Sequence, residues 1–104
     1  MMNTANLPIT LSETSIQEFC QRHHIRWLAL FGSVLREDFR PESDIDVLVE
    51  FEPEHVPGLI GLLQMQDELA TLTGRTVDLL TPRFLHRQIR QQVLNEARVI
   101  YDVA

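Results

Sequence analysis

The clearest alternation of apolar and polar residues runs from Asp44 to Phe51, with the sequence DIDVLVEF. Ile45, Val47 and Val49 fall on one face of an extended chain, because successive side chains of a strand point to opposite sides. A strand is therefore predicted over residues 44–51, with its acidic residues on the other face.

Shorter apolar runs predict the other strands. The run IRWLALF over residues 25–31 stops at a glycine and is typical of a buried strand. The segment TVDLL over residues 76–80 alternates again, with Asp78 on the face opposite Val77 and Leu79. Residues 99–101 can add a short final strand.

Helical spacing predicts two helices before the third strand. Residues 12–23 form an amphipathic helix that Ser12 or Thr14 can cap. Residues 59–73 form a second helix, with Gly74 just past its end. Its inward residues are predicted to be Leu59, Leu62, Leu63, Leu69 and Leu72.

Two further helices are predicted from capping and breaking signals. Thr81 is expected to cap a helix over residues 82–98, with Pro82 at its first position. A short helix is expected to run from Ser33 to Asp38 and to break before Pro41.

Together these elements predict an α/β fold, with a small mixed sheet of three to four strands and helices packed mainly on one face. The sheet is expected to be mixed because a helix separates the second and third strands, whereas the link between the first two is shorter. Residues 1–11 are expected to form a flexible N-terminal tail that Pro8 closes, and residues 12–104 a single domain.

Composition removes several classes of function. A net charge of −6 makes direct nucleic-acid binding by this chain alone unexpected. All nine basic residues are arginine, which excludes a P-loop lysine and Schiff-base chemistry. The single cysteine, Cys20, can form neither an internal disulfide nor a zinc cluster. No apolar run approaches ~18 residues and the N-terminus is unlike a secretion signal, so a cytoplasmic protein without membrane contact is expected.

Candidate chemistry concentrates between the first two predicted strands. Gly32 and Ser33 follow the first strand, and ten residues later the second strand opens with Asp44-Ile45-Asp46. A Gly-Ser turn offers backbone N–H groups and a hydroxyl to phosphates. Two carboxylates at i and i+2 of a strand point the same way and can share divalent ions that bridge those phosphates.

An isolated Asp-x-Asp pair is more often structural: Asp44 can cap a turn, and Asp46 can be a solvated strand residue. Here the strand after Asp46 is nearly all apolar and the Gly-Ser pair stands upstream. Asp78 falls beside the pair if the two strands are neighbours. Three carboxylates on one sheet face are hard to explain by stability alone, which favours a metal-dependent nucleotide site.

The pattern Gly32-Ser33, ten residues, Asp44-x-Asp46 and a distal Asp78 resembles the DNA polymerase β-type nucleotidyltransferase superfamily. The short chain and the run GSVLREDFRPESDIDVLV resemble its minimal nucleotidyltransferase (MNT) branch, the antitoxins of HEPN/MNT toxin–antitoxin pairs. The resemblance implies a polymerase beta-like nucleotidyltransferase fold.

The resemblance also implies roles for these residues. Gly32 would allow the close approach of phosphate, and Ser33 would hold the outer phosphates of the nucleotide. Asp44 and Asp46 would bind two Mg²⁺ ions. Asp78 would complete one metal site and help to deprotonate the attacking hydroxyl.

Arg36 matches an arginine often found after this Gly-Ser pair. It could touch phosphate, and an ion pair with Asp38 or Glu42 is an equal alternative.

The implied reaction is magnesium-dependent transfer of AMP from ATP to a tyrosine hydroxyl of a partner HEPN ribonuclease toxin, as in type VII-like pairs. This AMPylation would inactivate the toxin. Two alternatives stay open. One is a non-catalytic antitoxin that neutralises the toxin by complex formation. The other is a small-molecule nucleotidyltransferase, against which the lack of a second domain counts.

The histidines give weaker signals. His23 and His24 are adjacent near the end of the first predicted helix, so a helix C-terminal role or partial burial is favoured over metal binding. His55 and His86 have no companions at metal-ligand spacing.

Overall fold

The computed structural model describes residues 7, 9–36, 39, 40 and 42–103. Along the chain the helices, strands and short 3₁₀ turns are α1 (Glu13–Arg22), β1 (Ile25–Phe31), η1 (Gly32–Leu35), β2 (Ile45–Phe51), η2 (Pro53–His55), α2 (Leu59–Thr73), β3 (Val77–Leu80), η3 (Pro82–Phe84), α3 (Arg87–Glu96) and β4 (Arg98–Asp102).

The four strands form one mixed sheet in the order β3-β2-β1-β4. β1 pairs antiparallel with both β2 and β4, whereas β2 and β3 are parallel and are joined through α2. A parallel pair needs such a crossover, while the antiparallel pairs need only shorter links. The predicted mixed α/β sheet is confirmed.

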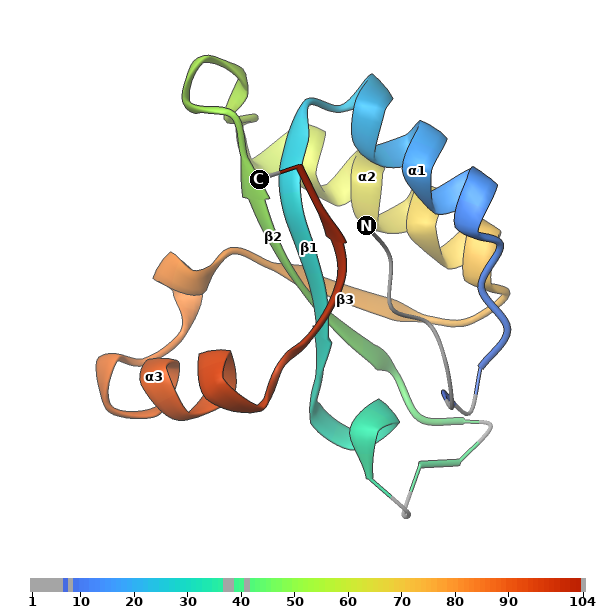
Figure 1. Ribbon diagram of the computed structural model, residues 1–104, viewed down its shortest axis with the longest axis vertical. Helices are drawn as coiled ribbons and strands as arrows, with labels where there is room; N and C mark the ends of the chain where they lie inside the picture. Colours follow the sequence, from blue (N-terminus) through green and yellow to red (C-terminus); the bar gives the residue numbers. More distant parts are fainter. Residues whose placement is uncertain (1–6, 8, 37–38, 41, 104) are drawn as a thin grey trace.

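Helices α1 and α2 lie side by side against one face of the sheet, and α3 lies apart from them (Figure 1). The core between these helices and the sheet includes Phe19 and Leu28, both fully buried, and Leu69 of α2. Ser12 caps α1 by accepting a hydrogen bond from the N–H of Ser15, as predicted. Gly74 ends α2 in the left-handed conformation, which favours glycine.

The N-terminal segment is partly described. Residues 1–6 and Pro8 of the expected tail lie outside the described residues. Leu7, Ile9 and Leu11 are partly buried and pack against the hydrophobic core. These three apolar side chains are therefore packed on the domain and do not extend away from it.

The inward face of α2 differs from the prediction. The buried residues are Leu62, Met65 and Leu69, whereas Leu59 is 68% exposed and Leu63 is 48% exposed. Leu72, also predicted to be inward, is 39% exposed. Apolar residues occur all around this helix, so the leucine pattern could not select the buried stripe; the i, i+3, i+7 spacing of the observed stripe is the one that faces the sheet.

The predicted helix over residues 82–98 is wrong in its first part, and it ends two residues early, at Glu96, because Arg98 begins β4. A single 3₁₀ turn follows Thr81, and α3 begins at Arg87 after His86, whose ring accepts a hydrogen bond from the N–H of Gln88. Leu85 between them is extended and only 8% exposed, so the chain leaves helical geometry where it buries this side chain.

The predicted helix over residues 33–38 is a shorter 3₁₀ turn, η1. Asp38 and Pro41 lie outside the described residues. Within the described part of the chain, no helix is long and apolar enough to cross a membrane.

Strand β3 is an edge strand, and Gln66 of α2 covers part of its open edge. The side-chain oxygen of Gln66 accepts a hydrogen bond from the N–H of Leu79 at 2.9 Å. We expect Gln66→Met to lower the free energy of unfolding by about 1–2 kcal/mol, because it leaves this N–H without its acceptor. Urea unfolding measures the change, and Gln64→Met, an exposed position on the same helix, is the control. Equal effects of the two variants would contradict a role for this hydrogen bond.

Candidate active site at the end of the sheet

Strand β1 ends at a turn that brings the backbone close to β2. Gly32 has a φ of 77°, a left-handed conformation that favours glycine. A Cβ at this position would clash with Oδ2 of Asp46 and lie 3.2 Å from its Cγ. Val34, only 1% exposed, anchors the turn in the core, and the N–H of Arg36 donates to the carbonyl of Ser33 at 2.9 Å. The glycine is thus required by the close approach of the Asp46 carboxylate.

The register of the sheet brings the acidic residues together. Asp46 is directly opposite Asp78 on the neighbouring parallel strand and opposite Phe31 on β1. Neighbouring strands are about 4.8 Å apart, so the side chains of Asp46 and Asp78 start from adjacent backbone positions. Asp44 immediately precedes β2, where the N–H of Ile45 donates to the carbonyl of Thr76. Two strands that alternate independently in the sequence therefore place three aspartates at one end of the sheet.

The electrostatics of this cluster centre on Asp46. Its half-burial raises the pKa of the carboxyl group above its usual range, and the negative charges of Asp78 and Asp44 raise it further. The positive charge of Arg36 acts in the opposite direction. Like charges held this close are costly in the absence of a cation between them.

A surface pocket opens beside the cluster. Its lining residues are Phe31, Gly32, Ser33, Arg36, Asp46, Val93 and Glu96. Four of the predicted site residues thus line one pocket. The other two are close to Asp46 of that lining: Asp44 is two residues before it in the sequence, and Asp78 is opposite it on β3. Asp38, one of the two alternative ion-pair partners of Arg36, lies outside the described residues.

Val93 and Glu96 of α3 were not among the predicted site residues. The strand that follows them, β4, pairs with β1, with Arg98 opposite Leu30. This pairing returns the end of α3 to the turn after β1. The sequence carries no local signal of that return, because it depends on the order of strands in the sheet.

The donor set fits a hard divalent cation. Carboxylate oxygens are the ligands that Mg²⁺ prefers. Burial of Asp46, together with the charges of Asp78 and Asp44, raises the pKa of its carboxyl group, so a cation at this place would offset an unfavourable ionised form. Gly32 and Ser33 of the neighbouring turn line the same pocket, and a turn of this kind can offer a hydroxyl and backbone N–H groups to phosphate. The arrangement can therefore hold a metal ion beside a phosphate group.

The raised pKa of Asp46 predicts a pH-dependent difference in stability. A folded protein that binds this proton more tightly than the unfolded chain loses stability as the pH rises from the ordinary carboxyl value, 3.8, through the raised pKa. The Asp46→Asn variant has no carboxyl group at this position, so it does not lose this stability as the pH rises. In the absence of Mg²⁺, we expect its free energy of unfolding to exceed that of the wild type by an amount that grows across this acidic range and then stays constant. Urea unfolding at a series of pH values measures it, and a difference independent of pH would contradict the shifted titration.

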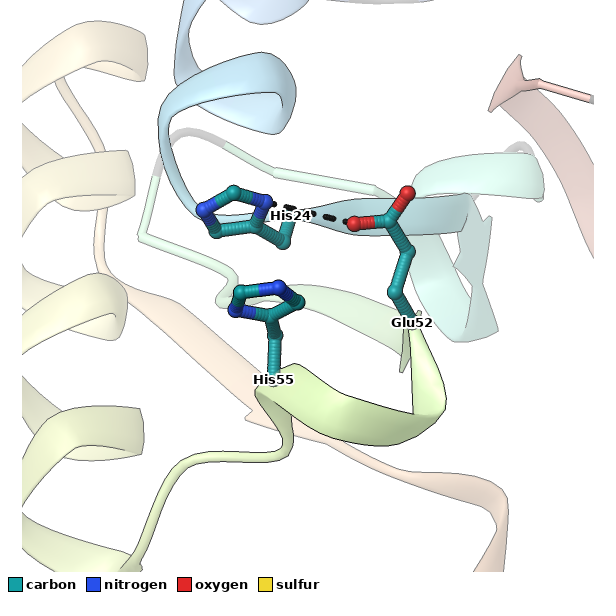
Figure 2. Close-up of side chains that lie close together, drawn as sticks. All are labelled: His24, Glu52 and His55. Atoms are coloured by element: carbon teal, nitrogen blue, oxygen red, sulfur yellow. Dashed lines mark hydrogen bonds and ion pairs between the residues drawn. The ribbon is translucent and has the colours of Figure 1, made fainter.

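The histidines form a group that the sequence spacing did not reveal. His24 and His55 stack with ring centroids 3.7 Å apart, and Nδ1 of His24 lies 3.2 Å from Oε2 of Glu52 (Figure 2). The sequence predicted no companion of His55 at metal-ligand spacing. Its companion in the structure comes from a distant segment, which the antiparallel pairing of β1 and β2 brings near. His23 instead contacts Glu68, with Nε2 3.0 Å from Oε1.

Solved structures share the fold. A toxin–antitoxin structure with AMP-PNP matches with a TM-score of 0.72 at 23% identity, over 89% of this chain and 75% of that chain. A complex of a tri-AMPylated HEPN toxin of Shewanella oneidensis with MNT antitoxin matches with a TM-score of 0.64 at 22% identity, over 88% and 70%. The predicted nucleotidyltransferase fold is confirmed.

Sequence comparison identifies the family. Protein adenylyltransferase MntA of Thermococcus cleftensis is 34% identical over 85 residues, which cover 82% of each chain. Residues 14–103 match the family described as Polymerase beta, Nucleotidyltransferase. The chain therefore belongs to the polymerase beta nucleotidyltransferase family.

Proposed function

We propose that this chain is the antitoxin of a HEPN/MNT pair and that it transfers AMP from ATP to a tyrosine hydroxyl of its HEPN toxin. The observation that carries the proposal is the register of Asp46 against Asp78, with Asp44 alongside and the Gly32-Ser33 turn at the same pocket. The similarity to MntA, named as a protein adenylyltransferase, supports the reaction type. The tri-AMPylated toxin in complex with MNT antitoxin, a structural neighbour, supports the kind of acceptor.

Asp44, Asp46 and Asp78 would hold two Mg²⁺ ions, which supply Lewis-acid stabilisation of the attacking and leaving oxygens. Ser33 and the backbone N–H groups of η1 bind the outer phosphates. Arg36 reaches a phosphate oxygen from the same pocket, a role that its position on the lining supports.

The reaction is attack by a tyrosine oxygen on the α-phosphorus of ATP. A new oxygen–phosphorus bond forms, the bond to the pyrophosphate oxygen breaks, and pyrophosphate leaves. Asp78 takes the proton of the attacking hydroxyl, a role for which its exposed side chain on the edge strand leaves room for a protein acceptor. We place the protein in the cytoplasm, which contains both ATP and Mg²⁺.

The position of the label in ATP tests the reaction class. Incubated with the HEPN partner and Mg²⁺, the chain is expected to label the partner from ATP carrying radioactive α-phosphorus and not from ATP carrying radioactive γ-phosphorus. Labelling from the γ-position would make it a kinase and contradict the proposal.

Neutralisation without catalysis is the second candidate function. The exposed apolar side chains of α2, including Leu59 and Ile60, favour contact with another protein whether or not transfer occurs. The doubly substituted Asp44→Asn/Asp46→Asn chain separates the two functions. If it still blocks the ribonuclease activity of the partner at equimolar concentration, complex formation alone is sufficient.

A further inference from the structure

The end of the β1–β2 hairpin opposite the aspartates carries a separate cluster of His24, Glu52 and His55 (Figure 2). Each residue offers one potential ligand atom, and these atoms all lie within 4.8 Å of one another. β1 has seven residues, so the cluster is roughly 20 Å from the aspartates at about 3.3 Å per residue. It is therefore independent of the nucleotide pocket.

Backbone contacts hold the three residues together. The N–H of Glu52 donates to the carbonyl of His24 at 2.9 Å, and the N–H of His55 donates to the carbonyl of Glu52 at 2.9 Å. His24 has a φ of 55°, which is uncommon for a residue other than glycine. Pro53 begins the η2 turn that leads to His55 and fixes one of its dihedral angles. The three residues thus come from two segments, and backbone contacts hold them close together before any ligand arrives.

The side chains of the cluster, although they contact one another, together present a set of donors that a cation can use. The two imidazole rings are stacked with an interplanar angle of 11°. Two imidazolium charges in this stack would repel each other, whereas each neutral ring presents a nitrogen lone pair. The Glu52 carboxylate adds a negative charge beside the His24 ring.

We propose that His24, Glu52 and His55 form a site for a divalent transition-metal ion of the zinc class. Two imidazoles and one carboxylate are a known donor set for Zn²⁺ and are a poor set for Mg²⁺, which prefers oxygen ligands. All three residues are exposed, so the rings can rotate onto the ion and water can complete its coordination.

Two donors on α1 and at its end are not available to this ion. His23 is engaged by Glu68. Cys20 is buried, and burial raises the pKa of its thiol to about 12, so it stays protonated. A bound ion would connect the α1–β1 junction to the loop between β2 and α2 and so stabilise the hairpin end that carries no nucleotide.

Zinc titration of the tag-free, chelator-treated protein tests the site. We expect one equivalent of Zn²⁺ to be taken from a chromophoric zinc indicator in excess Mg²⁺. His24→Asn and His55→Gln should each weaken this binding at least tenfold. Asparagine is chosen because it tolerates the left-handed backbone of His24. His86→Asn, which replaces an exposed histidine outside the cluster, should leave it unchanged.

Two further measurements locate the bound ion. Zn²⁺ should raise the melting temperature of the wild type and of His86→Asn but not that of His55→Gln. The Asp44→Asn/Asp46→Asn variant, which lacks two carboxylates of the acidic cluster, should still bind one equivalent of Zn²⁺. Unchanged zinc binding in both cluster variants, or its loss only in the aspartate variant, would overturn the proposal. Because no transferase activity is read, failure of this test leaves the proposed function standing.

Discussion

Asp46→Asn is expected to reduce the rate of AMP transfer severely while leaving the protein folded. Asp46 sits at the centre of the acidic cluster, opposite Asp78 and within reach of the Gly32 turn. If Asp46 holds a metal ion as proposed, losing its carboxylate removes several kcal/mol of transition-state stabilisation, and about 1.4 kcal/mol corresponds to each tenfold in rate. We therefore expect a loss on the order of 10³-fold, measured as the initial rate of label transfer from α-labelled ATP.

The same substitution should not destabilise the free protein. Burial and the charges of Asp78 and Asp44 already disfavour the ionised carboxylate, so a neutral amide of similar shape relieves repulsion. At neutral pH without Mg²⁺ its melting temperature should be at or above that of the wild type. Asp67→Asn, on the exposed side of α2, is the matched control and should retain transfer. Retained transfer in Asp46→Asn, or loss caused by unfolding, would contradict the assigned role.

Gly32→Ala is expected to damage both stability and transfer. The left-handed backbone alone penalises a Cβ by about 1–2 kcal/mol. The Cβ would also meet the Asp46 carboxylate, so the turn or the aspartate must move. A displacement of about 1 Å in a catalytic group can reduce the rate on the order of 10²-fold. Urea unfolding and the initial transfer rate measure the two effects.

Gly58→Ala is the matched glycine control. Gly58 caps α2 with negative φ, and a Cβ there would meet no atom within 4 Å. Its free energy of unfolding should stay within about 0.5 kcal/mol of the wild type, since the loss of a glycine cap and the stiffer unfolded chain act in opposite directions. Similar losses in the two variants would show that the Gly32 effect is not specific to the site.

Asp46→Asn and Gly32→Ala are expected to differ in their effect on stability, because the two wild-type residues differ in how well they suit the free protein. At Asp46 the wild-type residue is itself unfavourable in the free protein, because its charge is half-buried beside two others. At Gly32 the wild-type residue is the only type that fits the backbone without strain. Both residues fit the general observation that a functional site can depart from maximal stability.

The strands and the acidic cluster were predictable from local patterns. Alternation placed β2 within one residue of its observed start, and the apolar run placed β1 at its observed bounds. The alternation of TVDLL put Asp78 on the polar face, and the crossover through α2 made β2 and β3 neighbours. Short-range periodicity therefore placed Asp46 and Asp78 on the polar faces of their strands, and the pairing of the two strands brought them together.

Other features depend on tertiary contacts that periodicity does not encode. The start of α3 is set by the burial of Leu85, and the buried stripe of α2 by which of its apolar sides meets the sheet. The approach of Glu96 to the pocket follows from the pairing of β4 with β1. The stack of His24 and His55 needs the hairpin register, which joins residues 31 positions apart.

The mass of the HEPN partner, taken from the same gene neighbourhood, tests the central claim most directly. The purified chain, the partner, ATP and Mg²⁺ are incubated together, and the intact mass of the partner is measured. We expect a gain of one or more AMP units on a tyrosine, absent with Asp46→Asn and present with Asp67→Asn. No gain, with a stable complex and a blocked ribonuclease, would contradict catalysis and leave a stoichiometric binder.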